Sequence, residues 1–177
     1  MKLVYSIPGK IWWIHNFLPT DLYTGIHHAM IRERKALKLQ SVEGLWAEYL
    51  IKNLSKVPRR TEVKNYKPFE TLVTLIKHNP FHPVDVKEAS TVIHMLEKNS
   101  GIQWHNDGIW KYGATLYINH RWNKKWGGEF MFTDTNGHGF LPYVGNSLVL
   151  VKAPLEHKVN TVLSPLIPRM SIQLFMK

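Results

Sequence analysis

The sequence predicts an α+β fold in which short antiparallel strands form a sandwich or barrel and helices pack on one of its faces. Two observations lead to this prediction. Before about residue 90, apolar residues recur at helical spacing; after it, short strand-like runs alternate with turn sequences. The 177 residues, 44% of them apolar, are enough for one well-buried core and few for two. We therefore expect a single domain over residues 1–177, with supporting elements in 1–90 and the β-core in 91–177.

The first half is predicted to open with a short strand and to continue with three helices. The strand covers Ile11–Ile14, and the first helix begins after Pro19-Thr20-Asp21. The linker 78–83 contains two prolines, so no helix continues through it. The apolar positions of the three helices are, in order, Leu22, Ile26 and Met30; Leu45, Trp46, Leu50 and Leu54; and Phe69, Leu72, Val73 and Ile76.

The second half is predicted to consist of strands joined by turns. Gly and Asn, which tolerate positive φ, gather at 126–128, 136–139 and 145–146, and these segments are expected to be turns. The predicted strands cover 91–96, a segment around His105, 112–119, 129–133, 147–152, 156–162 and 170–176.

Composition excludes several classes of protein. Cysteine is absent, so disulfides, zinc fingers and iron-sulfur clusters are excluded, and a transition metal must be held by His, Asp, Glu or water. No window approaches 18 uninterrupted apolar residues, and the apolar stretch at the N-terminus is too short for a signal peptide. We expect a soluble, cytoplasmic protein that does not enter a membrane. The sequence does not predict its oligomeric state.

The net charge of +10 favours an anionic partner. Within residues 31–67, ten Lys and Arg face four acidic residues. Nucleic acid, an acidic protein and a dicarboxylate all match this sign, and a solvated helical surface is the plain alternative. No nucleic-acid motif accompanies the basic residues, so nucleic acid is not the favoured partner.

Two histidines and an aspartate form a candidate metal site. His105 and Asp107 are the single His-x-acid pair in a chain with ten histidines. If the strand continues through both, residues i and i+2 share a face and can reach one metal ion. Together with His157, they match the two-histidine, one-carboxylate set of non-haem Fe(II) oxygenases.

Alternation along two strands places polar side chains on one face. Thr115, Tyr117 and Asn119 share a face of one strand, and Arg169, Ser171 and Gln173 share a face of another. These faces either line a wet pocket or meet solvent, and solvent is the expectation for Gln173. The guanidinium of Arg169, with Ser171 beside it, matches the far carboxylate of a dicarboxylic acid, and an ordinary surface Arg is the alternative.

This ordered set of motifs resembles the prolyl 4-hydroxylase-like Fe(II)/2-oxoglutarate oxygenases. The resemblance covers about residues 90–177, and residues 11–29 look like the usual strand and helix that open the family's fold. It rests on His105-x-Asp107, Gly113-Ala114-Thr115-Leu116-Tyr117-Ile118-Asn119, Trp122, Gly127-Gly128-Glu129-Phe130, His157 and Arg169-Met170-Ser171. The resemblance implies a double-stranded β-helix, a jelly-roll barrel, with N-terminal helices packed on one sheet.

The resemblance also implies roles for individual residues. His105, Asp107 and His157 look like the iron ligands, and Arg169 like the partner of the far carboxylate of 2-oxoglutarate. Tyr117, with Ser171 and Thr115 as lesser candidates, would contact the same cosubstrate. Many members carry a tyrosine about ten residues before the first ligand, where this chain has Met95. Collagen-type members use Lys in place of Arg169, so the likeness is to the wider superfamily.

The activity that the resemblance implies is hydroxylation of a C–H bond, coupled to decarboxylation of 2-oxoglutarate to succinate. A protein or peptide residue, proline first, or a free amino acid is the expected substrate, and ascorbate is a candidate reductant. Trp110, Asn119 and Trp122 are candidate substrate contacts. A nucleic-acid dealkylating oxygenase is one alternative, but a second arginine after Arg169 is missing. A non-catalytic jelly-roll binding module is the other. Trp104, on the face opposite His105, is expected in the core.

Overall fold

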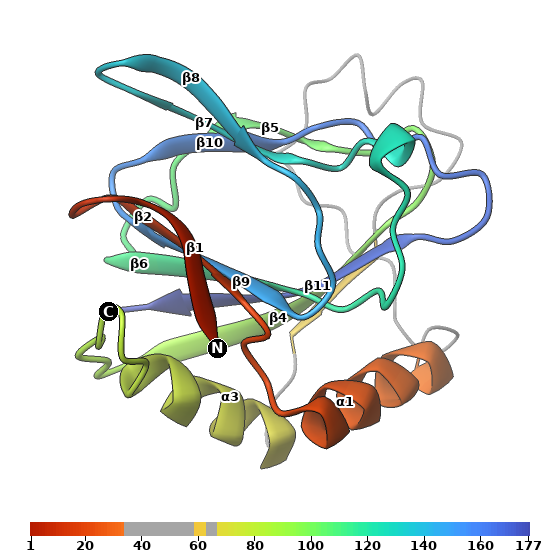
Figure 1. Cartoon of the computed structure of the whole chain (residues 1–177), viewed down its shortest axis with the longest axis horizontal. Helices are drawn as coiled ribbons and strands as arrows, with labels where there is room; N and C mark the ends of the chain where they lie inside the picture. Colours follow the sequence, from red (N-terminus) through yellow and green to blue (C-terminus); the bar gives the residue numbers. More distant parts are fainter. Residues whose placement is uncertain (34–58, 63–66) are drawn as a thin grey trace.

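Two antiparallel sheets stack face to face, and two helices cover the outer side of the larger one (Figure 1). This computed structural model describes residues 1–33, 59–62 and 67–177. The architecture is the double-stranded β-helix that the sequence predicted. Its helices are α1 (Thr20–Glu33) and α3 (Lys67–Lys77), with a 3₁₀ turn η1 at Lys124–Trp126. Its strands are β1 (Lys2–Ile7), β2 (Ile11–His15), β3 (Arg59–Glu62), β4 (Ala89–Leu96), β5 (Ile102–His105), β6 (Tyr112–Tyr117), β7 (Phe130–Asp134), β8 (Gly137–Leu141), β9 (Ser147–Lys152), β10 (Glu156–Val159) and β11 (Arg169–Met176).

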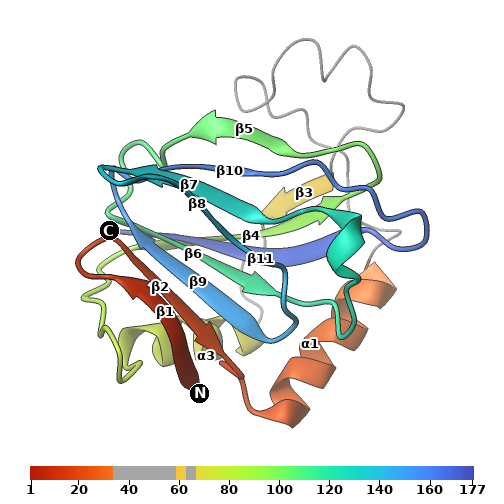
Figure 2. The same cartoon turned by 45° about the horizontal axis from the view of Figure 1, so that its top comes forward.

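Strand order places β11 in the interior of the larger sheet. This sheet has the order β1-β2-β9-β6-β11-β4-β3, and the smaller sheet has the order β5-β10-β7-β8. Figure 2 shows the larger sheet with β11 between β6 and β4. Because β11 is paired on both edges along most of its length, its cavity-facing side chains have fixed neighbours on each side.

The helices bury the apolar face of the larger sheet. Ile172 and Leu174 of β11 alternate with polar residues and point toward Ile26 of α1 and Leu72 of α3 in one apolar cluster. All four side chains are at most 1% exposed. Burial of each such side chain is worth roughly 1.5–3 kcal/mol, so this layer fixes which face of β11 turns inward. The prediction that the helices pack on one sheet is confirmed.

A second apolar cluster joins the two sheets. Phe130 and Phe132 of β7 pack with Tyr117 of β6 and Val149 of β9. The aromatic rings close one part of the space between the sheets, and the part beside β5 and β11 stays open as a cavity. The cavity therefore lies inside the barrel and not on its surface.

Some predicted elements differ from those of the structure. β1 was not predicted, and β8 occupies a segment predicted as a turn. β5 ends at His105, so Asp107 does not continue the strand. The predicted helix at 45–54 and most of the basic segment 31–67 lie outside the described residues.

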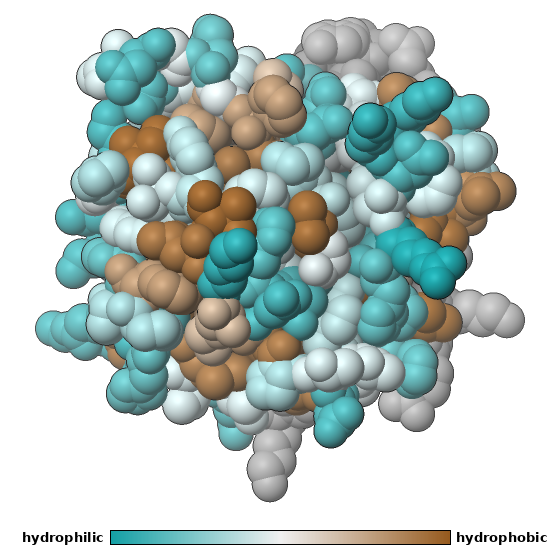
Figure 3. Space-filling view, viewed as in Figure 1, coloured by the Kyte–Doolittle hydropathy of each residue, from teal (hydrophilic) through white to brown (hydrophobic). Residues whose placement is uncertain are grey.

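The edge strand β1 leaves apolar side chains on the surface. Val4 and Tyr5 are 43% and 39% exposed, and Figure 3 shows apolar atoms over this strand. The ring of Tyr5 lies 6.2 Å from that of Phe132 in the smaller sheet. β1 therefore leans over the open end between the two sheets. Within the described ranges, no helix is long and apolar enough to cross a membrane.

We predict that part of the stability depends on a neutral His27. This histidine of α1 is half-buried against the His120 ring, 4.3 Å away, and its Nδ1 has no hydrogen-bond partner among the described residues. Burial, then the charges of His120 and His28, lower the pKa of His27 below 6.5. The unfolded chain then binds more protons in acid, so the free energy of unfolding should fall as the pH drops below 6.5.

Chemical denaturation at about pH 7.5 and about pH 5.5 measures this effect. The variant His27→Gln should lose less stability between the two pH values than the wild type does. Thr24→Gln, on the same helix and without a titratable group, should lose as much as the wild type. An unchanged pH dependence in His27→Gln would contradict the prediction.

Candidate functional site

The two histidines of the candidate metal site face each other from adjacent strands of the smaller sheet. His105 ends β5, and its partner in the strand register is His157 of β10. Each Nδ1 lies within hydrogen-bond distance of the carbonyl oxygen two residues earlier, 2.7 Å to Gln103 and 2.9 Å to Leu155. A ring that donates its Nδ1 proton to a carbonyl keeps the lone pair on Nε2. Both rings are thus arranged to offer Nε2 to a metal.

Asp107 completes the cluster from the loop after β5. Its Oδ1 lies 3.6 Å from Nε2 of His157 and 3.9 Å from Nε2 of His105. The chain leaves the strand after His105, so the expected i, i+2 strand geometry is wrong, although the three groups meet within 4.8 Å. A Cβ on Gly113 of β6 would lie 2.1 Å from Oδ2 of Asp107. The bare Gly113 therefore makes room for the carboxylate.

The surroundings of His157 favour its neutral form. The side chain is buried, and its ring stacks on Phe130 with centroids 5.1 Å apart. Burial lowers the pKa of His157, the Asp107 carboxylate opposes this shift, and His105 adds to it. A metal ligand must be neutral imidazole, so the histidine is prepared for that role. Two such nitrogens and one carboxylate fit a transition metal with open positions, as in non-haem Fe(II) sites.

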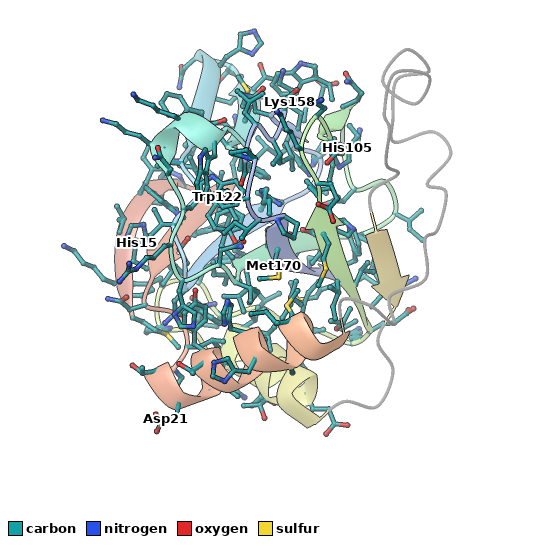
Figure 4. All side chains as sticks on the ribbon, turned by 90° about the vertical axis from the view of Figure 1, so that its right-hand side faces the viewer. His15, Asp21, His105, Trp122, Lys158 and Met170 are labelled. Carbon is teal, nitrogen blue, oxygen red and sulfur yellow. The ribbon has the colours of Figure 1, made fainter. Side chains whose placement is uncertain are left out.

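A cavity of about 400 Å³ extends from this cluster between the two sheets. The candidate ligands lie in its wall, and the cavity-facing side of β11 forms the wall opposite the smaller sheet. Figure 4 labels His105 on the ribbon of β5, above the strands of the larger sheet. The lining includes Ile102, His105, Asp107, Trp110, Thr115, Phe130, His157, Val159, Arg169, Ser171, Gln173 and Phe175.

Arg169, at the start of β11, places a buried cation in the cavity wall. Its side chain is 1% exposed, Nε donates to the Gly128 carbonyl at 2.9 Å, and Nη1 donates to Ser171 Oγ at 3.1 Å. Nη2 has no partner, and no carboxylate pairs with the guanidinium, among the described residues. A buried charge without a counter-ion is costly, so this group is suited to an anion.

A second unpaired polar atom lies beside the guanidinium. Tyr117 of β6 is fully buried, its ring centroid is 5.0 Å from Cζ of Arg169, and its Oη has no partner in the described part of the chain. Burial raises the pKa of Tyr117, and Arg169 opposes this shift, so the phenol stays protonated and able to donate. Arg169 Nη2 in the cavity wall and Tyr117 Oη beside it, in the apolar cluster between the sheets, are two donors that fit the two oxygens of a carboxylate.

The start of β11, next to Arg169, is held in place by hydrogen bonds that the sequence did not reveal. Tyr143 Oη accepts from the backbone N of Ile118 and of Asn119, and it lies 2.6 Å from both Asn119 Oδ1 and the Met170 carbonyl. Asn119 Oδ1 also accepts from the Met170 N–H at 2.8 Å. The side chain of Asn119 is thus committed to the start of β11 and lies outside the cavity lining. Tyr143 carries no local signal of this role, because its partners are distant in sequence.

The remaining predicted residues divide between the cavity and its supports. Thr115 and Gln173 line the cavity, and Gln173, expected to face solvent, is 8% exposed. Trp110 also lines the cavity, with its ring 5.9 Å from that of Phe175. Trp122 instead donates to the Gly127 carbonyl at 2.9 Å, and Figure 4 shows it apart from His105.

Trp104 lies on a face of the smaller sheet that the sequence did not predict. Trp104, expected in the core, is 40% exposed, with Lys158 over its ring at 5.3 Å. It lies on the outer face of the smaller sheet, which no helix covers in the described part of the chain. Met95 is packed in the cluster under the helices, and its neighbour His94 lines the cavity.

Comparison with solved structures assigns the fold. A prolyl-4-hydroxylase from Pseudomonas putida superposes with a TM-score of 0.74 at 15% identity, covering 96% of this chain and 93% of that one. A prolyl hydroxylase from Trichoplax adhaerens, solved with a hypoxia inducible factor peptide fragment, gives 0.74 at 15% identity, covering 96% and 84%. The chain has the fold of the prolyl 4-hydroxylases.

Other oxygenases share this fold. The viral collagen prolyl hydroxylase of Paramecium Bursaria Chlorella virus-1, in its 2-oxoglutarate complex, gives a TM-score of 0.68 at 11% identity over 95% of this chain and 96% of that one. An oxidoreductase of the 2OG-Fe(II) oxygenase family from Burkholderia pseudomallei gives 0.64 at 15% identity, covering 94% and 83%. No protein-family model matches the sequence, and no curated protein matches it. At these identities the likeness assigns architecture, and activity must be argued from the site.

We predict that Gly113→Ala disrupts the metal cluster. The new Cβ would overlap Oδ2 of Asp107 and displace the carboxylate from the two histidines. Binding of Mn(II), measured by calorimetry, should weaken at least about tenfold. Gly25→Ala is the matched control, because nothing lies within 4 Å of its Cβ and the residue is helical. It should keep metal affinity and gain about 0.5–1 kcal/mol of stability. Equal metal affinity in both variants would contradict the proposed packing.

We predict that Tyr143→Phe destabilises the fold. The substitution leaves the buried N–H group of Asn119 without its acceptor, whereas the N–H of Ile118 keeps the Met170 carbonyl at 3.1 Å. At about 1–3 kcal/mol for one unpaired buried group, the free energy of unfolding should fall by roughly 1–3 kcal/mol. Tyr5→Phe, which removes a hydroxyl from an exposed ring on β1, should change it by less than about 0.5 kcal/mol. Denaturant titration compares the two, and similar values would contradict the role given to Tyr143.

Proposed function

We propose that this protein is an Fe(II)/2-oxoglutarate-dependent dioxygenase that hydroxylates a C–H bond. The observation that carries the proposal is the buried guanidinium of Arg169, whose Nη2 has no partner among residues 1–33, 59–62 and 67–177, in the wall of the cavity that contains the histidine and aspartate cluster. A five-carbon dicarboxylate with a 2-oxo group has one end for each site. The substrate that we favour is a residue of a protein or peptide, proline first, with a free amino acid as the variant.

The donors of the chain match both ends of such a cosubstrate. Nε2 of His105, Nε2 of His157 and the carboxylate of Asp107 would hold Fe(II) and leave its other positions open. Nη2 of Arg169 and, beside it, Oη of Tyr117 would hold the far carboxylate. When bound, Fe(II) and 2-oxoglutarate supply the oxidation: one oxygen atom of O₂ converts 2-oxoglutarate to succinate and CO₂, and the other enters the substrate C–H bond as hydroxyl.

The walls of the cavity contribute orientation and exclusion of water. Ile102, Phe130 and Val159 are buried apolar residues around the histidines, and they keep the site dry. Ile109, 79% exposed, lies with Trp110 and Phe175 in the lining, which gives the cavity an apolar entrance. Such an entrance suits an aliphatic side chain or ring presented by a peptide. The structural neighbour solved with a peptide supports the same choice.

Anaerobic titration of the protein with Fe(II) and then 2-oxoglutarate tests the proposal. A weak visible charge-transfer band should appear only when both are present. Arg169→Ala should retain the metal and lose about 100-fold in 2-oxoglutarate affinity, the loss expected for charged hydrogen bonds. Asp107→Ala should lose the metal. The control variant Arg121→Ala lacks one exposed positive charge, and it should bind Fe(II) and 2-oxoglutarate as the wild type does.

Succinate release then identifies the substrate class. The panel should contain proline-containing peptides, free amino acids and alkylated oligonucleotides, each with and without ascorbate, which we keep as the candidate reductant. Stimulation by a peptide or amino acid supports the proposed function, and stimulation by the oligonucleotides alone would replace it with dealkylation. If the wild-type protein gives no charge-transfer band, the proposed function is wrong, and the non-catalytic binding module is the alternative that is left.

A further inference from the structure

A row of polar side chains leads from Arg169 to the metal cluster. The cavity-facing residues of β11 are Arg169, Ser171, Gln173 and Phe175, at every second position. Gln173 is paired in register with Thr115 of β6. The four residue steps from Arg169 to Gln173 span roughly 13 Å of extended strand. Gln173 therefore lies well away from the guanidinium of Arg169.

Gln173 lies toward the metal end of this row. The next cavity-facing pair along the sheet is Phe175 with Gly113, and Gly113 is the residue against which the Asp107 carboxylate packs. Gln173 is thus one residue pair away from a candidate metal ligand. Among the described residues of β11 it is the side-chain hydrogen-bond donor nearest to that end.

The neighbour of Gln173 on β6 fixes its amide. The Thr115 hydroxyl donates to Oε1 of Gln173, and both residues are buried in the cavity wall. With Oε1 occupied, Nε2 is left as the free end of the amide. Nε2 makes no hydrogen bond to another described residue, and it is not fully buried. The amide N–H group is therefore accessible from the cavity and oriented before a ligand arrives.

We infer that Gln173 is a specificity-determining residue whose Nε2 donates to the 2-oxo oxygen of the cosubstrate, an inference that rests on the proposed function. Arg169 alone would accept any dicarboxylate of suitable length, because it contacts only the far carboxylate. An oriented amide near the metal adds a donor for the 2-oxo oxygen, which other dicarboxylates of the same length lack. Thr115 is a positioning residue, since it acts by holding Oε1.

Two ligands separate this role from a structural one. 2-Oxoglutarate carries both ends, whereas glutarate carries two carboxylates of the same spacing and no 2-oxo group. Calorimetry with the Mn(II)-loaded protein measures both affinities without turnover. Gln173→Leu should bind 2-oxoglutarate about two- to tenfold more weakly, the loss expected for one hydrogen bond to a neutral oxygen, and bind glutarate as the wild type does. Arg169→Ala should weaken both ligands.

Further variants test orientation and charge. Thr115→Val should weaken 2-oxoglutarate binding by less than Gln173→Leu does, because the amide remains but is no longer fixed. Gln173→Glu should bind 2-oxoglutarate more weakly than Gln173→Leu, because its carboxylate repels the partial negative charge of the 2-oxo oxygen. Mn(II) affinity and the unfolding midpoint of each variant control for damage to the site.

The outcomes that overturn the inference are distinct from those that overturn the proposed function. Unchanged 2-oxoglutarate affinity in Gln173→Leu, or an equal loss for both ligands, would overturn the role of Gln173 alone. Failure of the wild-type protein to bind 2-oxoglutarate would overturn the proposed function itself.

Discussion

The buried guanidinium of Arg169 is the constraint on which the rest of the cavity depends. A permanent charge with 1% exposure needs donors, acceptors and ring faces in fixed places around it. The Gly128 carbonyl and Ser171 meet two of its groups, and the rings of Tyr117 and Tyr143 lie 5.0 and 5.3 Å from Cζ. A side chain on Gly128 would collide with Cδ of Arg169, so this neighbour has to be glycine. Several fully buried residues surround this cation, and its Nη2 still has no partner among the described residues.

The two sheets divide the chemistry between them. The smaller sheet supplies both histidines, from paired strands, and the larger sheet supplies the row of polar side chains on β11 and β6. Asp107 comes from the loop that crosses from one sheet to the other. An ion held by all three ligands would therefore tie the sheets together at the mouth of the barrel, in addition to its chemical role.

The sequence was most informative where local periodicity decides the outcome. The alternation of β11 predicted that Arg169, Ser171 and Gln173 share one face, and the apolar alternation in the same strand explains why that face turns inward. Long-range hydrogen bonds decided the rest. Tyr143 looks like any loop aromatic, and Asn119 looked like a cavity residue, until the fold brought both to the backbone of Met170. β8 was missed because Gly137 and Gly139 indicate a turn, and the close approach of Phe132 that requires Gly139 is a tertiary contact.

The position of β11 within the larger sheet has a consequence for the order in which the protein is made. β11 follows every other described strand in the sequence, yet it lies between β6 and β4 and carries Arg169. In a chain that is still being synthesised, both histidines and Asp107 leave the ribosome before β11 does. Until then, the edges of β6 and β4 that pair with β11 have no partner strand. The complete cavity cannot assemble until residues 169–176 have been synthesised. A chain whose synthesis stops before residue 169 therefore lacks the buried cation of the cavity.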